Sequence, residues 1–167
     1  MKRRSLLLLA GAVTVAASPL GGCGFQLRAS QSFAFQTVAI NPNPGGLLAI
    51  ELRRSFGDAV RVLDVDEALS SAQVVVDLLQ EQREKTVVGV NSSGQVREFQ
   101  LRIRVRFRVR TPQGQELVPE SEVVQHRDIS FNEAAVLAKE AEEVLLYRHM
   151  QSDLVQQLLR RLATLKL

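Results

Sequence analysis

The amino-acid sequence predicts an α+β domain, in which an antiparallel sheet of about four strands carries two helices packed on one face. Three observations predict this class. Residues 101–110 alternate strictly between apolar and charged side chains, as a half-buried strand does. Residues 133–164 contain no Pro or Gly and carry apolar residues at helical spacing. The segments follow the order β–α–β–β–β–α, which gathers the strands in the middle of the chain.

The first elements of the domain are short. Residues 37–40 form an apolar run that predicts a strand, and the Asn-Pro-Asn-Pro-Gly-Gly segment 41–46 ends it. Residues 47–56 carry apolar side chains four positions apart, which predicts a helix of about three turns. Gly57 is placed to cap this helix. Residues 60–63 are compatible with one more short strand.

Three longer strands follow. They are predicted over residues 74–90, 101–110 and 116–129, with turns at 91–94 and 111–114. Both turns end in glycine, the residue that adopts a positive φ without strain. The short turns predict that these strands pair in sequence as antiparallel neighbours.

The last element is a single long helix over residues 133–164, with Asn132 as its N-cap. At the usual rise of 1.5 Å per residue it would be about 48 Å long. Its predicted apolar stripe consists of Leu137, Ala141, Leu145, Met150, Leu154, Leu158, Leu162 and Leu165.

Charge and composition argue against several classes of function. The 21 basic and 18 acidic residues give a net charge of +3, and three basic residues near the N-terminus account for this excess. With few aromatic residues and no Trp, we expect no nucleic-acid partner. A single cysteine excludes an internal disulfide and a cysteine-based zinc cluster. His126 and His149 are far apart in sequence, so we expect no metal and no cofactor. Ser130 and Asp128 lack a histidine at known triad spacing and no other catalytic constellation is evident, so we expect no enzymatic activity.

The N-terminus resembles a bacterial lipoprotein signal peptide, residues 1–22. A basic start is followed by the apolar segment 6–17, which is too short to span a bilayer of ~30 Å. Leu20-Gly-Gly-Cys23 then resembles a lipobox, in which the cysteine thiol receives a lipid. The alternative is an ordinary secretory signal with a chance cysteine. We expect lipidation at Cys23, a tether over residues 23–36 and a single domain over 37–167.

Two further expectations concern export. Gly24 follows the cysteine, where an aspartate would favour retention in the inner membrane of proteobacteria, so we expect an outer-membrane lipoprotein on the periplasmic side. The arginines at positions 3 and 4 leave both the general secretory and the twin-arginine route open.

Three segments together resemble the LPS-assembly lipoprotein family LptE. They are Gly-Cys-Gly-Phe-Gln-Leu-Arg at 22–28, Gly-Gln-Val-Arg-Glu-Phe-Gln at 94–100, and the last helix with its Leu-Ala-Lys at 137–139. The resemblance implies a subunit that plugs the outer-membrane β-barrel LptD, assists its assembly and binds lipopolysaccharide. The alternative is a periplasmic lipoprotein adaptor of another envelope machine, such as an auxiliary subunit of a lipid-trafficking ABC system or a secretin pilotin.

The strand at 101–110 has an apolar face and an arginine face. The charged face, which we call the arginine ladder, consists of Arg102, Arg104, Arg106, Arg108 and Arg110. If Gly114 forms a bulged turn that pairs Thr111 with Gln115, the ladder is matched by acids on the next strand. The predicted pairs are Arg110 with Glu116, Arg106 with Glu120, and Arg104 with Glu122, whereas Arg102 and Arg108 face valines.

Two interpretations of these cations therefore stay open. Guanidinium groups match phosphate geometry, so Arg102 and Arg108 are candidate lipopolysaccharide-binding residues, together with Lys139 on the last helix. The structural interpretation is sheet pairing for the ladder and a solvated lysine beside Glu140 and Glu143.

Overall fold

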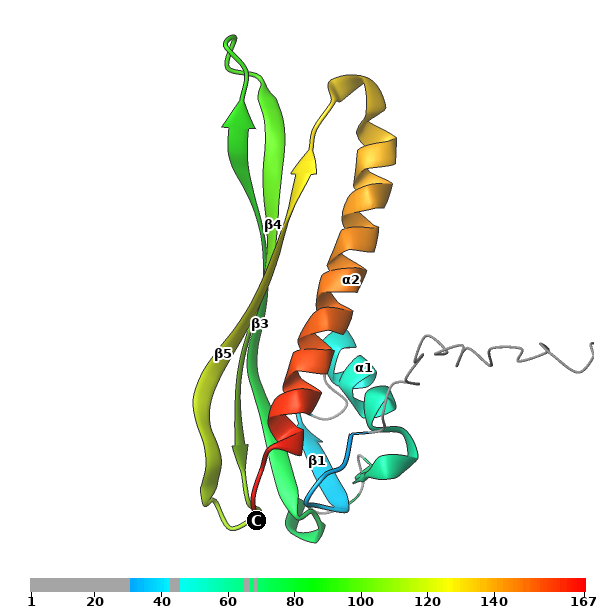
Figure 1. Ribbon diagram of the computed structural model, residues 1–167, viewed down its shortest axis with the longest axis vertical. Coiled ribbons are helices and arrows are strands. Elements are labelled where there is room, and N and C mark those ends of the chain that lie inside the picture. The colour runs from blue at the N-terminus through cyan, green and yellow to red at the C-terminus, as the bar shows by residue number, and fades with distance from the viewer. Residues whose placement is uncertain (1–30, 43–45, 65–66, 68) are drawn as a thin grey trace, which may run out of the picture.

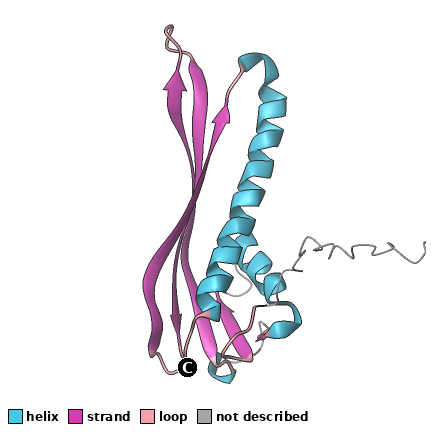
Figure 2. Ribbon diagram, in the orientation of Figure 1, coloured by secondary structure: helices cyan, strands magenta, loops and turns pink. Residues whose placement is uncertain are grey.

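The computed structural model describes residues 31–42, 46–64, 67 and 69–167. It confirms the α+β class: in this part of the chain a five-stranded sheet carries two α-helices on one face (Figures 1 and 2). The predicted signal peptide and Cys23 lie outside the described residues. No helix in the described residues is long and apolar enough to cross a membrane.

The elements lie close to their predicted positions. The strands are β1 (Thr37–Asn41), β2 (Arg61–Val62), β3 (Val74–Val90), β4 (Val96–Arg110) and β5 (Glu116–Ser130). The α-helices are α1 (Leu47–Phe56) and α2 (Val136–Ala163). The short 3-10 helices are η1 (Gly57–Ala59), η2 (Leu69–Ser71) and η3 (Glu133–Ala135).

The sheet has the order β2-β1-β3-β4-β5 and is mixed. The β3–β4 and β4–β5 pairs are antiparallel, as predicted, but β1 pairs in parallel with both β2 and β3. This difference has a topological reason. After β1 the chain passes through α1 before it returns to the sheet, and such a crossover sets the returning strand parallel to the first.

The larger of two clusters of buried apolar residues in the described part of the chain forms the core between the sheet and the two helices. The apolar face of β4 is its centre, and five β4 side chains from Leu101 to Val109 are wholly buried. Helix α1 contributes Leu48, Leu52 and Phe56, spaced four positions apart as predicted. The smaller cluster consists of Ala39, Leu63, Ala72 and Val75.

The packed part of the chain begins ahead of β1. Phe33 and Phe35 lie in the segment expected to be a tether, yet they belong to a cluster of three rings with Phe56. Phe35 is buried in the core. The domain therefore extends to the N-terminal side of the boundary expected at Thr37.

The predicted apolar stripe of the last helix is correct only in its second half. Met150, Leu154, Leu158 and Leu162 are buried, whereas Leu137 is 82% exposed and Leu145 is 50% exposed. The reason is rotation about the helix axis. An α-helix has 3.6 residues per turn, so residues chosen every four positions move gradually around its surface. Counting back from the buried Met150 by whole turns leads to Leu146, Glu143 and Lys139 instead. These three residues are half-buried, which shows that they face the sheet.

The start of this helix also differs in detail from the prediction. The Asn132 side chain accepts a hydrogen bond from the Ala134 backbone N–H, so it caps η3, and α2 begins three residues later at Val136. A tighter 3-10 turn at a helix start is common.

Candidate functional site

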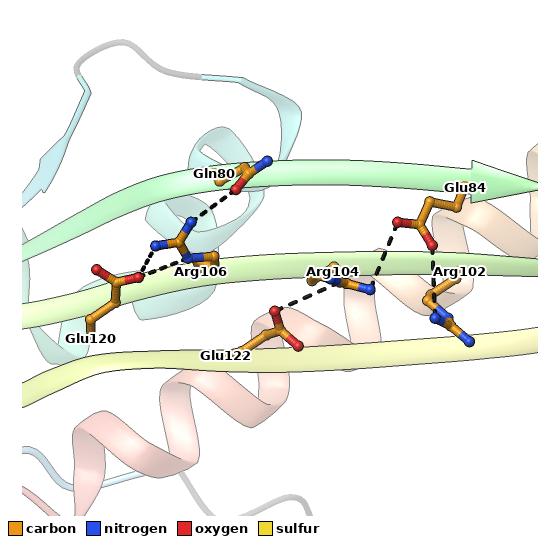
Figure 3. Close-up of polar contacts among 7 residues, drawn as sticks. All are labelled: Gln80, Glu84, Arg102, Arg104, Arg106, Glu120 and Glu122. Carbon is orange, nitrogen blue, oxygen red and sulfur yellow. Dashed lines mark hydrogen bonds and ion pairs between the residues drawn. The ribbon is translucent and has the colours of Figure 1, made fainter.

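The arginine ladder lies on the face of the sheet that carries no α-helix. Because side chains alternate along β4, burial of its apolar face against the helices directs all five arginines to the other side. The four arginines from Arg102 to Arg108 have exposed side-chain fractions between 34% and 44%. Figure 3 shows three of them between acidic residues of β3 and β5.

The predicted β4–β5 register holds only beside the turn. Arg110 lies opposite Glu116, and the Thr111 N–H donates to the Gln115 carbonyl oxygen, as predicted. Two irregularities between Phe107 and Arg110 then shift the register, so the acids predicted opposite Arg104 and Arg106 are displaced along β5. Bulges of this kind add residues to one strand and are not encoded by side-chain alternation.

Two predicted ion pairs survive the shift as diagonal contacts (Figure 3). Arg106 donates to Glu120 and also to the Gln80 side chain of β3. The Arg104 Nε atom lies 3.6 Å from a carboxylate oxygen of Glu122, although the residue directly opposite Arg104 is a valine. Long side chains reach diagonal neighbours across a sheet.

Arg102 and Arg108 also have carboxylate partners, which come from β3 rather than β5. The Arg102 Nη1 atom lies 3.8 Å from Glu84, and the Arg108 Nε atom donates to Asp77 at 2.8 Å. We expected no acid opposite these two arginines because that expectation used the β4–β5 hairpin alone. Both neighbours of a central strand supply partners, and β3 supplied the missing ones.

Asp77 is the most buried member of this charged face, with a side chain 3% exposed. It accepts hydrogen bonds from Arg108, Arg110 and Asn41, so it joins β1, β3 and β4. Burial alone raises the pKa of the Asp77 carboxyl, but the hydrogen bonds from the two arginines and Asn41 outweigh it. The pKa therefore lies below its ordinary value, and the ionised form is stabilised.

Lys139 lies elsewhere, in a pocket between the start of α2 and the sheet that we call the distal pocket. The pocket has a volume of about 60 Å³. It is lined by Lys85, Phe99, Ile129, Ser130, Phe131, Val136, Lys139, Glu140 and Glu143. The Lys139 Nζ atom donates to the Ser130 hydroxyl and to Glu142, rather than to the Glu140 and Glu143 expected from sequence spacing.

A second ammonium group, that of Lys85 on β3, lines the same pocket. Its Nζ atom donates to Glu143 at 2.6 Å and lies 4.4 Å from the centre of the Phe99 ring. The pocket therefore combines two cations with an aromatic wall, since Phe99 also packs edge-on against Phe131. The sequence did not point to Lys85, because only the packing of α2 on the sheet brings it beside Lys139.

The structure separates the three candidate lipopolysaccharide-binding residues. Arg102 and Arg108 are on the open face of the sheet, whereas Lys139 is on the face that carries the helices. One compact headgroup therefore cannot contact all three. His126 lies opposite Arg102, and the described residues contain no group of three or more His, Cys, Asp or Glu side chains able to hold a metal.

These features define a class of protein: a two-layer α+β domain with a long helix, whose charged groups form ion pairs along the sheet. The LptE family, described as lipopolysaccharide-assembly, matches residues 35–162. The LPS-assembly lipoprotein LptE of Yersinia pestis is 31% identical over 168 residues, which cover 98% of this chain and 78% of the relative. The LPS-assembly lipoprotein LptE of Pectobacterium atrosepticum is 29% identical, and the match covers 99% of this chain and 88% of the relative.

Solved structures show the same likeness. An uncharacterised lipoprotein B of Nitrosomonas europaea has a TM-score of 0.72 and 32% identity, covering 84% of this chain and 90% of that one. The rare lipoprotein B of Shewanella oneidensis has a TM-score of 0.65 and 23% identity, and the match covers 77% of this chain and 95% of that one. At this identity the likeness shows the fold alone. The chain belongs to the LptE family, and this membership supports a role in lipopolysaccharide assembly.

Proposed function

We propose that the protein is an outer-membrane lipoprotein subunit of the lipopolysaccharide transport complex, which plugs an LptD-like β-barrel, assists its assembly and binds lipopolysaccharide. It performs no chemical reaction in this role. The family supports the general role. The observation that carries lipid binding is the distal pocket, because it places two ammonium groups beside aromatic rings at one end of the molecule.

The surroundings of the pocket suit an amphiphile. Its volume, about that of two water molecules, admits one small polar group. Val87, Val88 and Val90 of β3, and Val136 and Leu137 of α2, are exposed apolar residues at the same end of the molecule. A phosphate in the pocket would compete with Glu142 and Glu143 for the two lysines, while acyl chains contact the apolar residues outside.

The first experiment measures lipopolysaccharide binding to the folded protein. Because the candidates lie on two faces, Lys139→Ala and the pair Arg102→Ala/Arg108→Ala are tested separately and then combined. We expect Lys139→Ala to weaken binding several-fold, and we expect salt to weaken binding by the wild type. Arg104→Ala is the control, with unchanged binding and a stability loss of at most about 1 kcal/mol. Unchanged binding in the triple variant would overturn the lipid-binding proposal.

The second experiment tests the barrel partner. Photocrosslinkers at Ser92 and Gln113 probe opposite ends of the sheet, because these residues lie in the turns before and after β4. We expect a large outer-membrane β-barrel protein to be captured from at least one end. Capture of small periplasmic proteins alone would contradict the plug and favour the adaptor of another envelope machine.

A further inference from the structure

A second cavity lies between the two helices, well away from the arginine ladder. This cleft has a volume of about 480 Å³, and we call it the interhelical cleft. It is lined by Leu47, Ile50, Glu51 and Arg54 of α1, Arg83 of β3, and Val144, Tyr147, Arg148 and Gln151 of α2. Its size is within the range of ligand-binding clefts.

The floor of the cleft is already organised by hydrogen bonds. The Gln151 side chain donates to Glu51 at 2.7 Å and accepts from Arg83 at 2.8 Å. The Arg83 guanidinium also lies over the Tyr147 ring, at 5.4 Å from its centre, and the Tyr147 hydroxyl donates to the Glu84 carbonyl oxygen. Glu51, the one carboxylate among the described lining residues, is therefore engaged with Gln151, and Arg83 is held in place.

The rim of the cleft is different. Arg54 and Arg148 make no ion pair or side-chain hydrogen bond with other described residues, although they come from two separate helices. The same lining includes exposed apolar side chains, of which Leu47 is 64% exposed and Val144 is 52% exposed. Two guanidinium groups that pair with no other described residue and lie beside apolar surface are complementary to a ligand that carries both carboxylates and apolar side chains.

We propose that the interhelical cleft binds an acidic peptide segment of a partner protein, with apolar side chains on the cleft and carboxylates on Arg54 and Arg148. A protein occupant is favoured over a lipid by the composition of the lining. Its described residues include three arginines and a tyrosine and no lysine, and Arg and Tyr are enriched at protein interfaces whereas Lys is depleted. The distal pocket, by contrast, contains two lysines.

The inference rests on the proposed role as a subunit of a multi-protein complex, which would supply such a segment. The test does not use that complex. A fluorescent peptide of alternating Leu and Glu is titrated with the mature full-length chain in detergent, and a matched peptide has Gln in place of every Glu. Anisotropy is measured for the wild type, Arg54→Gln/Arg148→Gln and Arg160→Gln. Arg160 is the control, because it is an exposed α2 arginine outside the cleft.

We expect the wild type and Arg160→Gln to bind the acidic peptide about tenfold more tightly than the neutral one, and the double variant to lose this preference. No binding by the wild type, equal binding of the two peptides, or a preference retained in the double variant would overturn the inference. Micelles containing phosphatidylglycerol form a further arm. Arginine-dependent binding to these micelles without peptide binding would assign the cleft to an anionic lipid and overturn the peptide proposal.

The outcomes of the two proposals are separable. Failure of the peptide assay leaves the barrel crosslinks at Ser92 and Gln113 unaffected. Failure of those crosslinks with a positive peptide assay would keep the cleft as a peptide site and remove the barrel as its source.

Discussion

Asp77 shows how one buried residue can organise a charged surface. It follows three buried valines in β3, and its side chain points to the open face of the sheet, opposite Arg108. Two guanidinium groups and the Asn41 amide donate to it, so its charge is balanced in a place that water hardly reaches. Removal of one partner from such a group leaves the others without compensation.

We predict that Asp77→Asn destabilises the domain by about 2 kcal/mol at pH 7, less than a fully buried pair would lose because Arg108 can regain water. The folded pKa of Asp77 lies below its unfolded value of about 3.9, so its stabilising effect is complete above that value and is lost as the pH falls through the folded pKa. Urea unfolding at several pH values measures the difference between wild type and variant. A difference that stays constant from about pH 7 to pH 3 would contradict this assignment.

At the scale of elements, α2 consists of two unlike halves. The second half, from Met150, packs its apolar side chains against β4 and α1. The first half extends along the upper part of the sheet with Leu137, Val144 and Leu145 exposed (Figure 1). The helix therefore gains most of its packing energy from its carboxyl-terminal half, whereas its amino-terminal half packs only through partly buried side chains such as Leu146 and Tyr147.

This division predicts that the same Leu→Ala substitution changes the free energy of unfolding by very different amounts in the two halves. Leu154→Ala removes a wholly buried side chain and should cost about 3 kcal/mol. Leu137→Ala should change stability by less than about 0.5 kcal/mol, because the side chain already lies in water and alanine favours helix. Urea midpoints of the two variants measure both losses, and equal losses would show that the Leu137 side chain is packed as tightly as that of Leu154.

At the scale of the whole molecule, the first described residues and the distal pocket lie toward opposite ends. Phe33 packs beside the end of α1, and the distal pocket lies at the start of α2 (Figure 1). The 28 residues of α2 correspond to about 42 Å at 1.5 Å per residue. The described part of the chain therefore begins toward the end of the molecule that lies opposite the distal pocket.

We predict that Cys23→Ser abolishes incorporation of labelled palmitate and releases the protein from membranes, since a lipid on Cys23 is the expected anchor. The unfolding transition of the domain should be unchanged, because the described core begins after that position. Gly24→Asp provides a second arm, and a density gradient should then find the lipidated protein in the inner membrane. Palmitate incorporation into Cys23→Ser would refute the anchoring site.

The sequence by itself determined the local features of this protein. Alternation predicted the buried and charged faces of β4, glycines predicted the turns, and helical spacing predicted α1 to the residue. These follow from interactions among residues that are close in the chain. The lipopolysaccharide-binding residues remain predictions. Lipidation at Cys23 also remains a prediction, because Cys23 lies outside the described residues.

Only the tertiary structure decided how distant segments meet. The parallel pairing of β1 and the partners of Arg102 and Arg108 on β3 both depend on contacts between segments far apart in sequence. The bulges near Phe107 changed the β4–β5 partners by one or two residues. Arg104 and Arg106 still reach their predicted acids diagonally, whereas Arg110 pairs with Asp77 of β3. Periodicity fixes which face a side chain occupies, but register and packing fix which group it meets there.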